Sequence, residues 1–349
     1  MPQTRQRTSP MFPRLGFPGP VFPRPAFRPH LRAVLPLLLL VAGFLAAAVP
    51  GAAVAAESAA LRSDGLDRRY ILYRPGSAPS DRALPLVLVL HDADADAMHA
   101  LDHYGWKGAA ESHGFLVASL EATPADPGSP AQYLRNPLVW NDGSGAAADR
   151  PPVDDVAYVR DVLAHLSARG RIDPDRVFAA GFGHGGAMVQ RLAVELSDRI
   201  AAFASVGGHL RVSGTLRRAR PVYLLFGAQD PLAPATGGAV PSPFASGARV
   251  PPIGGVVAAW RTALDCPSAP SSEAEAARLR RTVWAGCRDD SFLVFTLVTD
   301  LGHQWPGAGP GPLPRRIVGP TSNAIPGAED IWTFFRSAAE IESTEHGTN

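Results

Sequence analysis

Short apolar runs alternate along this chain with stretches of helical periodicity. The run Leu84–Leu90 contains no polar residue, which is typical of a strand buried on both faces of a parallel sheet. Elsewhere apolar residues recur every three or four positions, as at Val156, Val159 and Leu163, and predict one face of a helix. Further strands are expected at Arg68–Pro75, Phe115–Leu120, Val177–Ala180, Phe203–Val206, Val222–Phe226 and Phe292–Val298. This alternation indicates an α/β fold with a mostly parallel, doubly wound sheet and helices on both faces.

The first 56 residues differ from the rest of the chain in composition. Six arginines precede an apolar run at Ala33–Val49, and neither segment contains an acidic residue. The small residues GAAVAAES follow the apolar run. This order predicts a signal peptide at residues 1–56, cleaved near Ala56, and a single domain at residues 57–349. An uncleaved anchor is the alternative, although the run is short for a membrane span and contains Pro36. We therefore expect a secreted protein, extracellular or periplasmic, without a stable membrane partner beyond the signal segment.

The charge balance changes sign once that segment is removed. Taking its six arginines from the 33 basic residues leaves 27, against 32 acidic ones. No basic field remains for nucleic acid, so we exclude a nucleic-acid partner. The two cysteines, Cys266 and Cys287, most simply form a disulfide in an exported protein, and a free pair is the alternative.

The stretch VFAAGFGHGGAM, residues 177–188, has the layout of a strand, a tight glycine turn and a helix. Ester hydrolysis on such a sheet places a serine on this turn, within Gly-x-Ser-x-Gly, and uses the next N–H group as an oxyanion donor. Here Gly183 holds the nucleophile position and His184 would supply the N–H group. Asp230 and His303 each follow a predicted strand, in the order taken by the acid and the histidine of a triad. We predict these two as catalytic residues, with a non-functional nucleophile position.

Several motifs together resemble the secreted polyhydroxybutyrate depolymerase and feruloyl esterase-like group of α/β-hydrolases. They include RRYILY, LPLVLVLH, VWNDG, VDDVAYVRDVL, IDPDRVFAAG, GHGGAM, GAQDPLAP and LGHQWPG, and the resemblance runs from about Arg68 to Phe335. It implies an α/β-hydrolase fold, hydrolysis of small-molecule or polymeric carboxylic esters, and no cofactor. It also matches Asp230 and His303 to the acid and the histidine of the group. Further positions that match motifs or a disulfide pair of the group are Trp140, Asn141, Asp154, Asp155, Cys266 and Cys287.

The loop HDADADAMH, residues 91–99, departs from the His-Gly-Gly-type oxyanion loop of that group. Asp92 would supply the second oxyanion N–H group, but Asp92 and Ala93 lack the freedom of glycine to approach a substrate oxygen. Asp92, Asp94 and Asp96 also bring negative charge to a place where an oxyanion would form. Like charges about 4 Å apart repel by roughly 4 kcal/mol at an effective dielectric constant of 20. Together with Gly183, this loop predicts a member that has lost, or nearly lost, the serine mechanism.

Two other functions remain open on the sequence. Water held beside Gly183 and activated by His303 and Asp230 would give an active carboxylic ester hydrolase. A protein without chemistry could instead bind ester or glycan fragments. Trp140, Asn141 and Trp305 are the predicted substrate-binding residues. The two indoles either lie in exposed loops, where they could stack on an aromatic acyl group or a sugar, or pack in the core.

Other side chains are weaker candidates for the missing chemistry. The His184 ring, Ser144 and Ser205 lack the turn position of a nucleophile. His99 and His103 have a four-residue spacing that suits zinc, but a polar helix start explains them better. We therefore predict no metal site.

Overall fold

The computed structural model describes residues 56–79, 81–93, 95–132, 135–143, 153–209, 214–239 and 249–346. The chain divides into two units, Met1–Val49 and Pro50–Asn349, and all described residues belong to the second. The predicted signal segment lies outside the described residues except for Ala56, and Asp94 and Ser144 lie outside them as well. Within the described ranges, no helix combines the length and the apolar character needed to cross a membrane.

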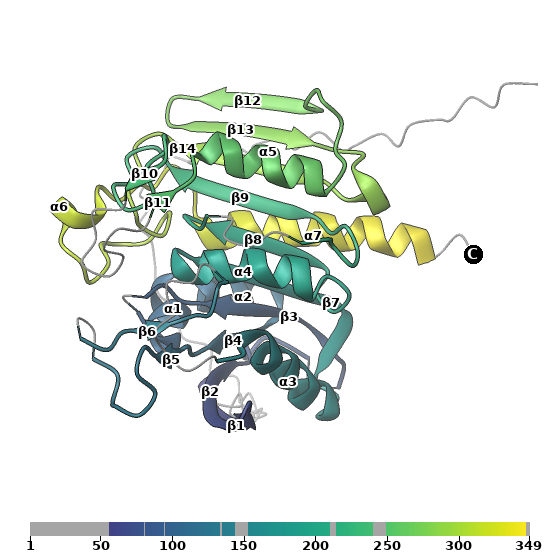
Figure 1. Cartoon of the computed structure of the whole chain (residues 1–349). Coiled ribbons are helices and arrows are strands. Elements are labelled where there is room, and N and C mark those ends of the chain that lie inside the picture. Colours follow the sequence, from purple (N-terminus) through teal and green to yellow (C-terminus); the bar gives the residue numbers. More distant parts are fainter. Residues whose placement is uncertain are drawn as a thin grey trace, which may run out of the picture. The chain divides into compact units, whose positions relative to one another are not determined.

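A ten-stranded sheet forms the centre of the described part of the second unit (Figure 1). In sheet order its strands are β1 (Ala56–Ser63), β2 (Leu66–Tyr73), β4 (Leu116–Leu120), β3 (Leu84–Leu90), β7 (Ile172–Phe182), β8 (Ala202–Val206), β9 (Val222–Gly227), β14 (Leu293–Val298), β13 (Leu279–Trp284) and β12 (Ser272–Ala276). The strands from β4 to β14 pair in parallel, and the strands outside them pair antiparallel. The parallel centre confirms the predicted fold class.

Helices cover both faces of this sheet (Figure 1). One face packs against α3 (Asp155–Ala168), α4 (His184–Glu195) and α5 (Ile253–Ala263). The other face packs against α1 (Ala97–His103), α2 (Trp106–His113) and α7 (Gly327–His346). Strand β3 shows why its sequence has no polar position, because Leu86 and Leu88 face the first helical layer and Val87 and Val89 face the second.

Short elements lie in the connecting segments. Two small antiparallel pairs are β5 (Thr123–Pro124) with β6 (Leu138–Val139), and β10 (Gly238–Ala239) with β11 (Arg249–Val250). The remaining elements are the 3₁₀ turn η1 (Arg288–Asp290) and α6 (Arg315–Val318). Cys266 and Cys287 are bonded to each other, which confirms the predicted disulfide and ties the segment after α5 to the start of η1.

The two strands at the edges of the sheet, β1 and β12, were not expected from the sequence. All five residues of β12 are exposed, and its sequence SEAEA has no apolar alternation that could predict a strand. Strand β1 begins at Ala56, within the small residues that were assigned to the end of the signal segment. Both strands exist because a neighbouring strand supplies their hydrogen-bond partners. A pattern of side chains alone does not reveal such pairing.

Candidate active site

The turn at Gly183 keeps the shape of a nucleophile turn. Gly183 joins β7 to α4 with φ 52° and ψ −114°, a conformation in which a side chain is strained. A Cβ atom added to Gly185 would lie 2.3 Å from the backbone oxygen of Leu90, so the start of α4 packs directly on the end of β3. Glycine at position 185 is what allows this close approach.

Asp230 and His303 meet at the carboxyl edge of the sheet. They follow β9 and β14, which are parallel neighbours, so both chain segments leave the sheet on the same side. Asp230 Oδ2 lies 2.7 Å from His303 Nδ1. Asp230 Oδ1 accepts hydrogen bonds from the N–H groups of Leu232 and Ala233, each at 2.8 Å. The carboxylate is thereby fixed in the orientation that a triad acid requires.

The side chain of Asp92 occupies the place where a nucleophile would be. Its Oδ2 lies 3.1 Å from His303 Nε2, and its Oδ1 accepts the N–H group of His184 at 2.7 Å. A Cβ atom on Gly183 would come within 2.3–2.6 Å of the three carboxylate atoms of Asp92. The Asp92 carboxylate therefore fills the room that a serine at position 183 would need. Sequence reasoning considered the backbone and the charge of Asp92 but did not place its carboxylate against Gly183 and His303.

The charges of this cluster compensate one another. Burial lowers the pKa of His303, but Asp230 and then Asp92 outweigh burial and raise that pKa well above its ordinary value. Burial raises the pKa of Asp92, but His303 and the N–H groups of His184 and Ala93 outweigh it and lower that pKa to about 2. At neutral pH the site holds an imidazolium between two carboxylates. The positive charge of His303 therefore compensates the negative charge that Asp92 brings to the site.

His91 and Trp140 hold the loop that carries Asp92. His91 Nε2 accepts the N–H group of Ala122 at 3.1 Å, so its proton is on Nδ1, which donates to the backbone oxygen of Asp92 at 2.7 Å. Burial lowers the pKa of His91 to about 4, which keeps this ring neutral. Trp140 Nε1 donates to the backbone oxygen of His91 at 2.9 Å. These contacts fix the backbone on which Asp92 stands.

Both predicted indoles lie in the interior. Trp140 is fully buried and Trp305 is 2% exposed, so the exposed positions considered for them are wrong and the core alternative holds. Trp305 stacks on Tyr104 with 4.5 Å between ring centroids and meets the Phe182 ring edge-on. Phe182 in turn lies 4.8 Å from the His303 ring. Ring contacts of this kind bury large apolar surfaces and stabilise the core.

Asn141 and the two aspartates at the start of α3 form a structural cluster. Asp155 is fully buried and binds Arg68 Nη2 and the Asn141 N–H group, each at 2.6 Å. The amide of Asn141 donates to the backbone oxygen of Val153 at 2.8 Å. Asp154 caps α3 by accepting an N–H group of its first turn. A role of Asn141 in substrate binding stays a prediction.

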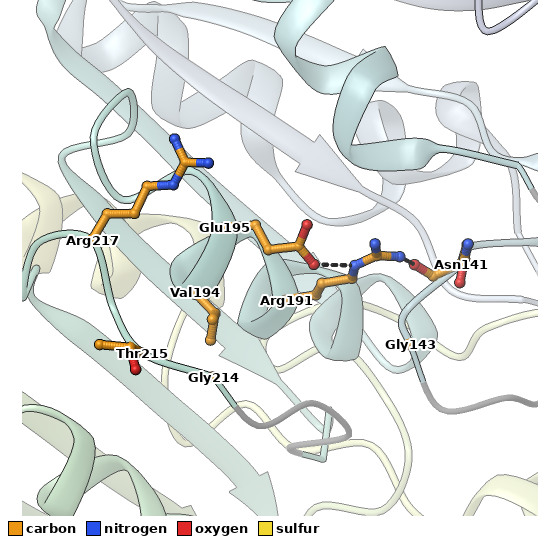
Figure 2. A pocket seen from close by; sticks show the side chains of 8 residues that line it. All are labelled: Asn141, Gly143, Arg191, Val194, Glu195, Gly214, Thr215 and Arg217. Atoms are coloured by element: carbon orange, nitrogen blue, oxygen red, sulfur yellow. Dashed lines mark hydrogen bonds and ion pairs between the residues drawn. The ribbon is translucent and has the colours of Figure 1, made fainter.

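Asn141 also borders a cavity of about 480 Å³ along α4 (Figure 2). Arg191 lies across this cavity, where it contacts Glu195 at 2.6 Å and the backbone oxygen of Asn141 at 2.6 Å. The other lining residues are Gly143, Val194, Gly214, Thr215 and Arg217. None of the residues that line this cavity belongs to the Asp92–His303–Asp230 cluster.

The weaker candidates have other partners. Ser205 is buried and donates to the backbone oxygen of Gly186 at 2.9 Å, so its hydroxyl faces the core. The His184 ring lies 3.4 Å from Asp142 Oδ2. The rings of His99 and His103 stack at 4.6 Å, and among the described residues no group of three or more His, Cys, Asp or Glu side chains is placed to hold a metal ion.

Known proteins resemble this chain over much of its length. A family model described as esterase PHB depolymerase matches residues 68–219. NocK of Nocardia uniformis subsp. tsuyamanensis, which is named as an esterase, is 30% identical over 291 residues, with 77% of this chain and 79% of NocK covered. Feruloyl esterase B of Piromyces equi is 27% identical over 177 residues, but only 31% of its length is matched, against 49% of this chain.

A solved structure shares the fold at low sequence identity. The acetyl xylan esterase from Aspergillus awamori superposes with a TM-score of 0.51 at 14% identity, over 71% of this chain and 94% of its own. This likeness shows the α/β-hydrolase fold, and the match to NocK and to the family model carries the assignment further. The chain belongs to the esterase PHB depolymerase family of α/β-hydrolases.

Proposed function

We propose that this protein is an exported member of an ester-hydrolase family in which serine-based ester hydrolysis has been lost or nearly lost. The family supports carboxylic esters as the ancestral substrates. The observation that carries the loss is the Asp92 carboxylate in the room of the missing side chain at Gly183. The basic, apolar and small-residue order of residues 1–56 supports export.

Acyl transfer requires oxyanion donors that are free to receive the substrate oxygen. In this site Asp92 Oδ1 already takes the N–H group of His184. An ester oxygen would have to displace a carboxylate that also binds His303. Loss of a single oxyanion donor lowers kcat by about 10²–10³-fold in serine hydrolases, and here the nucleophile is missing as well.

The alternative in which His303 activates a water molecule for ester hydrolysis is less favourable. A general base must be unprotonated at the working pH. Asp230 and Asp92 raise the pKa of His303 well above its ordinary value, so the ring carries its proton at neutral pH. The same two carboxylates occupy both ring nitrogens.

Hydrolysis assays on the purified mature chain test this proposal. Wild type and His303→Ala are compared on 4-nitrophenyl acetate, 4-nitrophenyl butyrate and methyl ferulate. We expect both proteins to stay near the rate without enzyme. A wild-type kcat of about 10 s⁻¹, which is ordinary for an enzyme, that disappears in His303→Ala would overturn the proposal. Calorimetric titration with ferulate and xylo-oligosaccharides then tests retention of the site for binding alone.

A further inference from the structure

A second cavity lies at the edge of the sheet where the parallel strands begin. Arg82 comes shortly before β3 and Arg171 comes directly before β7, and these two strands pair in parallel. Asp92, His303 and Asp230 follow the carboxyl ends of such strands, so their cluster lies at the opposite edge of the sheet. The cavity has a volume of about 380 Å³, which is within the usual range for small-molecule sites.

Positive charge dominates the lining of this cavity. The described residues that line it are Arg74, Asp81, Arg82, Ala83, Arg169, Gly170 and Arg171. Four guanidinium groups thus stand beside one carboxylate, although residues 57–349 as a whole carry more acidic than basic residues. Among the described lining residues Ala83 alone has an apolar side chain, so an acyl or aromatic group would find little apolar surface. The lining therefore favours a ligand that is polar throughout and negatively charged.

Most of this positive charge has no carboxylate partner. Within the described part of the chain, the guanidinium groups of Arg82 and Arg171 make no hydrogen bond and no ion pair. Arg74 donates to a backbone oxygen, which carries no formal charge. Arg169 lies 4.0 Å from Glu57 Oε1, and both side chains of this pair are exposed. An exposed pair at this distance is weak and leaves the guanidinium group available to another acceptor.

The end of α3 accounts for only part of the charge. Arg169 is the C-terminal cap residue of α3, where the negative end of the helix dipole favours a cation. That end corresponds to about half an elementary charge. Four arginines less one aspartate give the lining a net charge of +3. Like charges that share a cavity repel one another, and a bound anion would relieve this repulsion.

An unpartnered hydroxyl group lies close to two of the arginines. Tyr70 is fully buried, and its hydroxyl makes no hydrogen bond within the described ranges. Burial raises the pKa of Tyr70, Arg169 lowers it, and Glu57 and Arg171 act on it more weakly in opposite directions. A free donor beside the basic cavity is available to an anion or to a water molecule that accompanies it.

We propose that this cavity binds a compact phosphate group, either as the free ion or on a small polar molecule. Guanidinium groups match phosphate oxygens with two parallel hydrogen bonds, and such charge-assisted bonds are among the strongest in proteins. A phosphate group carries about 1.5 to 2 negative charges at neutral pH, so it compensates more of the lining than a carboxylate does. The inference goes beyond the proposed loss of ester hydrolysis and uses no residue of that site.

Calorimetric titration of the full chain with pyrophosphate tests the proposal, in a buffer without other multivalent anions. We expect one pyrophosphate per chain. The thermal midpoint should rise with the pyrophosphate concentration, because the ligand binds the folded protein. Titrations with inorganic phosphate and with glucose 6-phosphate then distinguish the free ion from a phosphate monoester. Absence of binding for all three compounds would overturn the proposal.

Matched pairs of arginine changes locate the site. Arg82→Gln with Arg171→Gln should weaken pyrophosphate binding by about 10²-fold or more, since each lost hydrogen bond to a charged group costs about tenfold or more. Arg62→Gln with Arg280→Gln removes the same charge at exposed positions where each arginine pairs with a carboxylate. This control pair should bind pyrophosphate as wild type does. Equal weakening in the two pairs would assign the effect to overall charge and contradict the proposal.

Asp81 allows a change in the opposite direction. Asp81→Asn removes the one carboxylate of the described lining and should tighten pyrophosphate binding severalfold, because it removes a repulsion. If the double arginine variant does not fold, Arg82→Gln alone decides, with binding expected to be about tenfold weaker. Weaker binding in Asp81→Asn, or wild-type binding in Arg82→Gln, contradicts the proposal. The ester assays are independent of these outcomes, because they concern the opposite edge of the sheet.

Discussion

The two halves of the candidate site differ in how much of a serine hydrolase site they keep. The acid–histidine half, Asp230 and His303, stands on neighbouring parallel strands and has the geometry that the sequence led us to expect. The nucleophile half, Gly183 and its surroundings, keeps its turn but contains the carboxylate of Asp92 from the loop after β3. The comparison teaches that the shape of a site and its chemistry can separate, because glycine preserves the turn while making room for another side chain.

The carboxylate of Asp92 occupies the volume that a side chain at position 183 would need. A Cβ atom at position 183 would lie 2.3 Å from Asp92 Oδ1, so a side chain there and the present Asp92 conformation exclude each other. The carboxylate is the end of a side chain and can move, but in moving it would leave His303 and the His184 N–H group. Neighbouring changes of this kind are not additive.

The largest expected effect comes from exchanging both residues at once. In Gly183→Ser with Asp92→Gly, the serine gains its room, the oxyanion donor becomes free and His303 loses one carboxylate. We expect hydrolysis of 4-nitrophenyl acetate to rise by about 10³-fold or more over wild type, since a complete triad contributes at least that much. Initial rates of the purified variants measure it.

The single variants sharpen this first prediction. Gly183→Ser alone should gain less than the double variant, because Asp92 still competes for the same space, and Asp92→Gly alone should gain nothing. Adding His303→Ala to the double variant should abolish the gain. Equal rates in Gly183→Ser and the double variant would show that Asp92 does not block the site.

The disulfide offers a change that lies in neither half. It closes a sequence separation of 21 residues between Cys266 and Cys287, for which the chain-entropy model gives about 3 kcal/mol. Cys266→Ser with Cys287→Ala should lower the free energy of unfolding in urea by that amount. The NMR titration of His303 should stay as in wild type, and a changed titration would mean that the two regions are linked.

Asp92 and His303 make the stability of the protein depend on pH in opposite directions. The pKa of Asp92 is about 2, below its ordinary 3.8, so its stabilisation is present above pH 3.8 and is lost as the pH falls towards 2. The raised pKa of His303 stabilises the fold below pH 6.5, and this contribution is lost as the pH rises through the folded value.

Asp92→Asn should remove the acid part of this dependence. We expect wild type to lose on the order of 2 kcal/mol more than the variant between pH 4 and pH 2, as urea unfolding measures. In the variant the NMR pKa of His303 should fall, although Asp230 still holds it above its ordinary value. Parallel stability curves for the two proteins would speak against a charged Asp92 in the folded state.

The smallest effect is expected at Asp96, in the same loop as Asp92. Asp96 is exposed and caps α1 by accepting the N–H group of His99 at 2.7 Å. Asn is as good a cap as Asp, so Asp96→Asn should change the free energy of unfolding by less than about 0.5 kcal/mol. A loss as large as that of Asp92→Asn would mean that the loop as a whole, and not the Asp92 carboxylate, stabilises the site.

Much of the fold could be predicted because burial on both faces leaves a continuous trace in the sequence. Leu84–Leu90 became β3 with unchanged bounds, and the run at Val222–Phe226 became β9. The edge strand β12 was missed because its five residues are exposed and its pairing with β13 depends on the backbone. The sequence left the exposure of Trp140 and Trp305 undecided, because a tryptophan after a strand has the same sequence context in a core as in a binding loop.

The sequence by itself determined the parallel core, the disulfide pair, and the empty nucleophile position at Gly183 with Asp230 and His303 in order. Only the tertiary structure decided what fills that position. Asp92 and Gly183 lie 91 residues apart, and no local pattern encodes the approach of one loop to another. That approach follows from the packing of α4 on the end of β3, where Gly185 meets the backbone of Leu90 and brings the Asp92 loop against the turn.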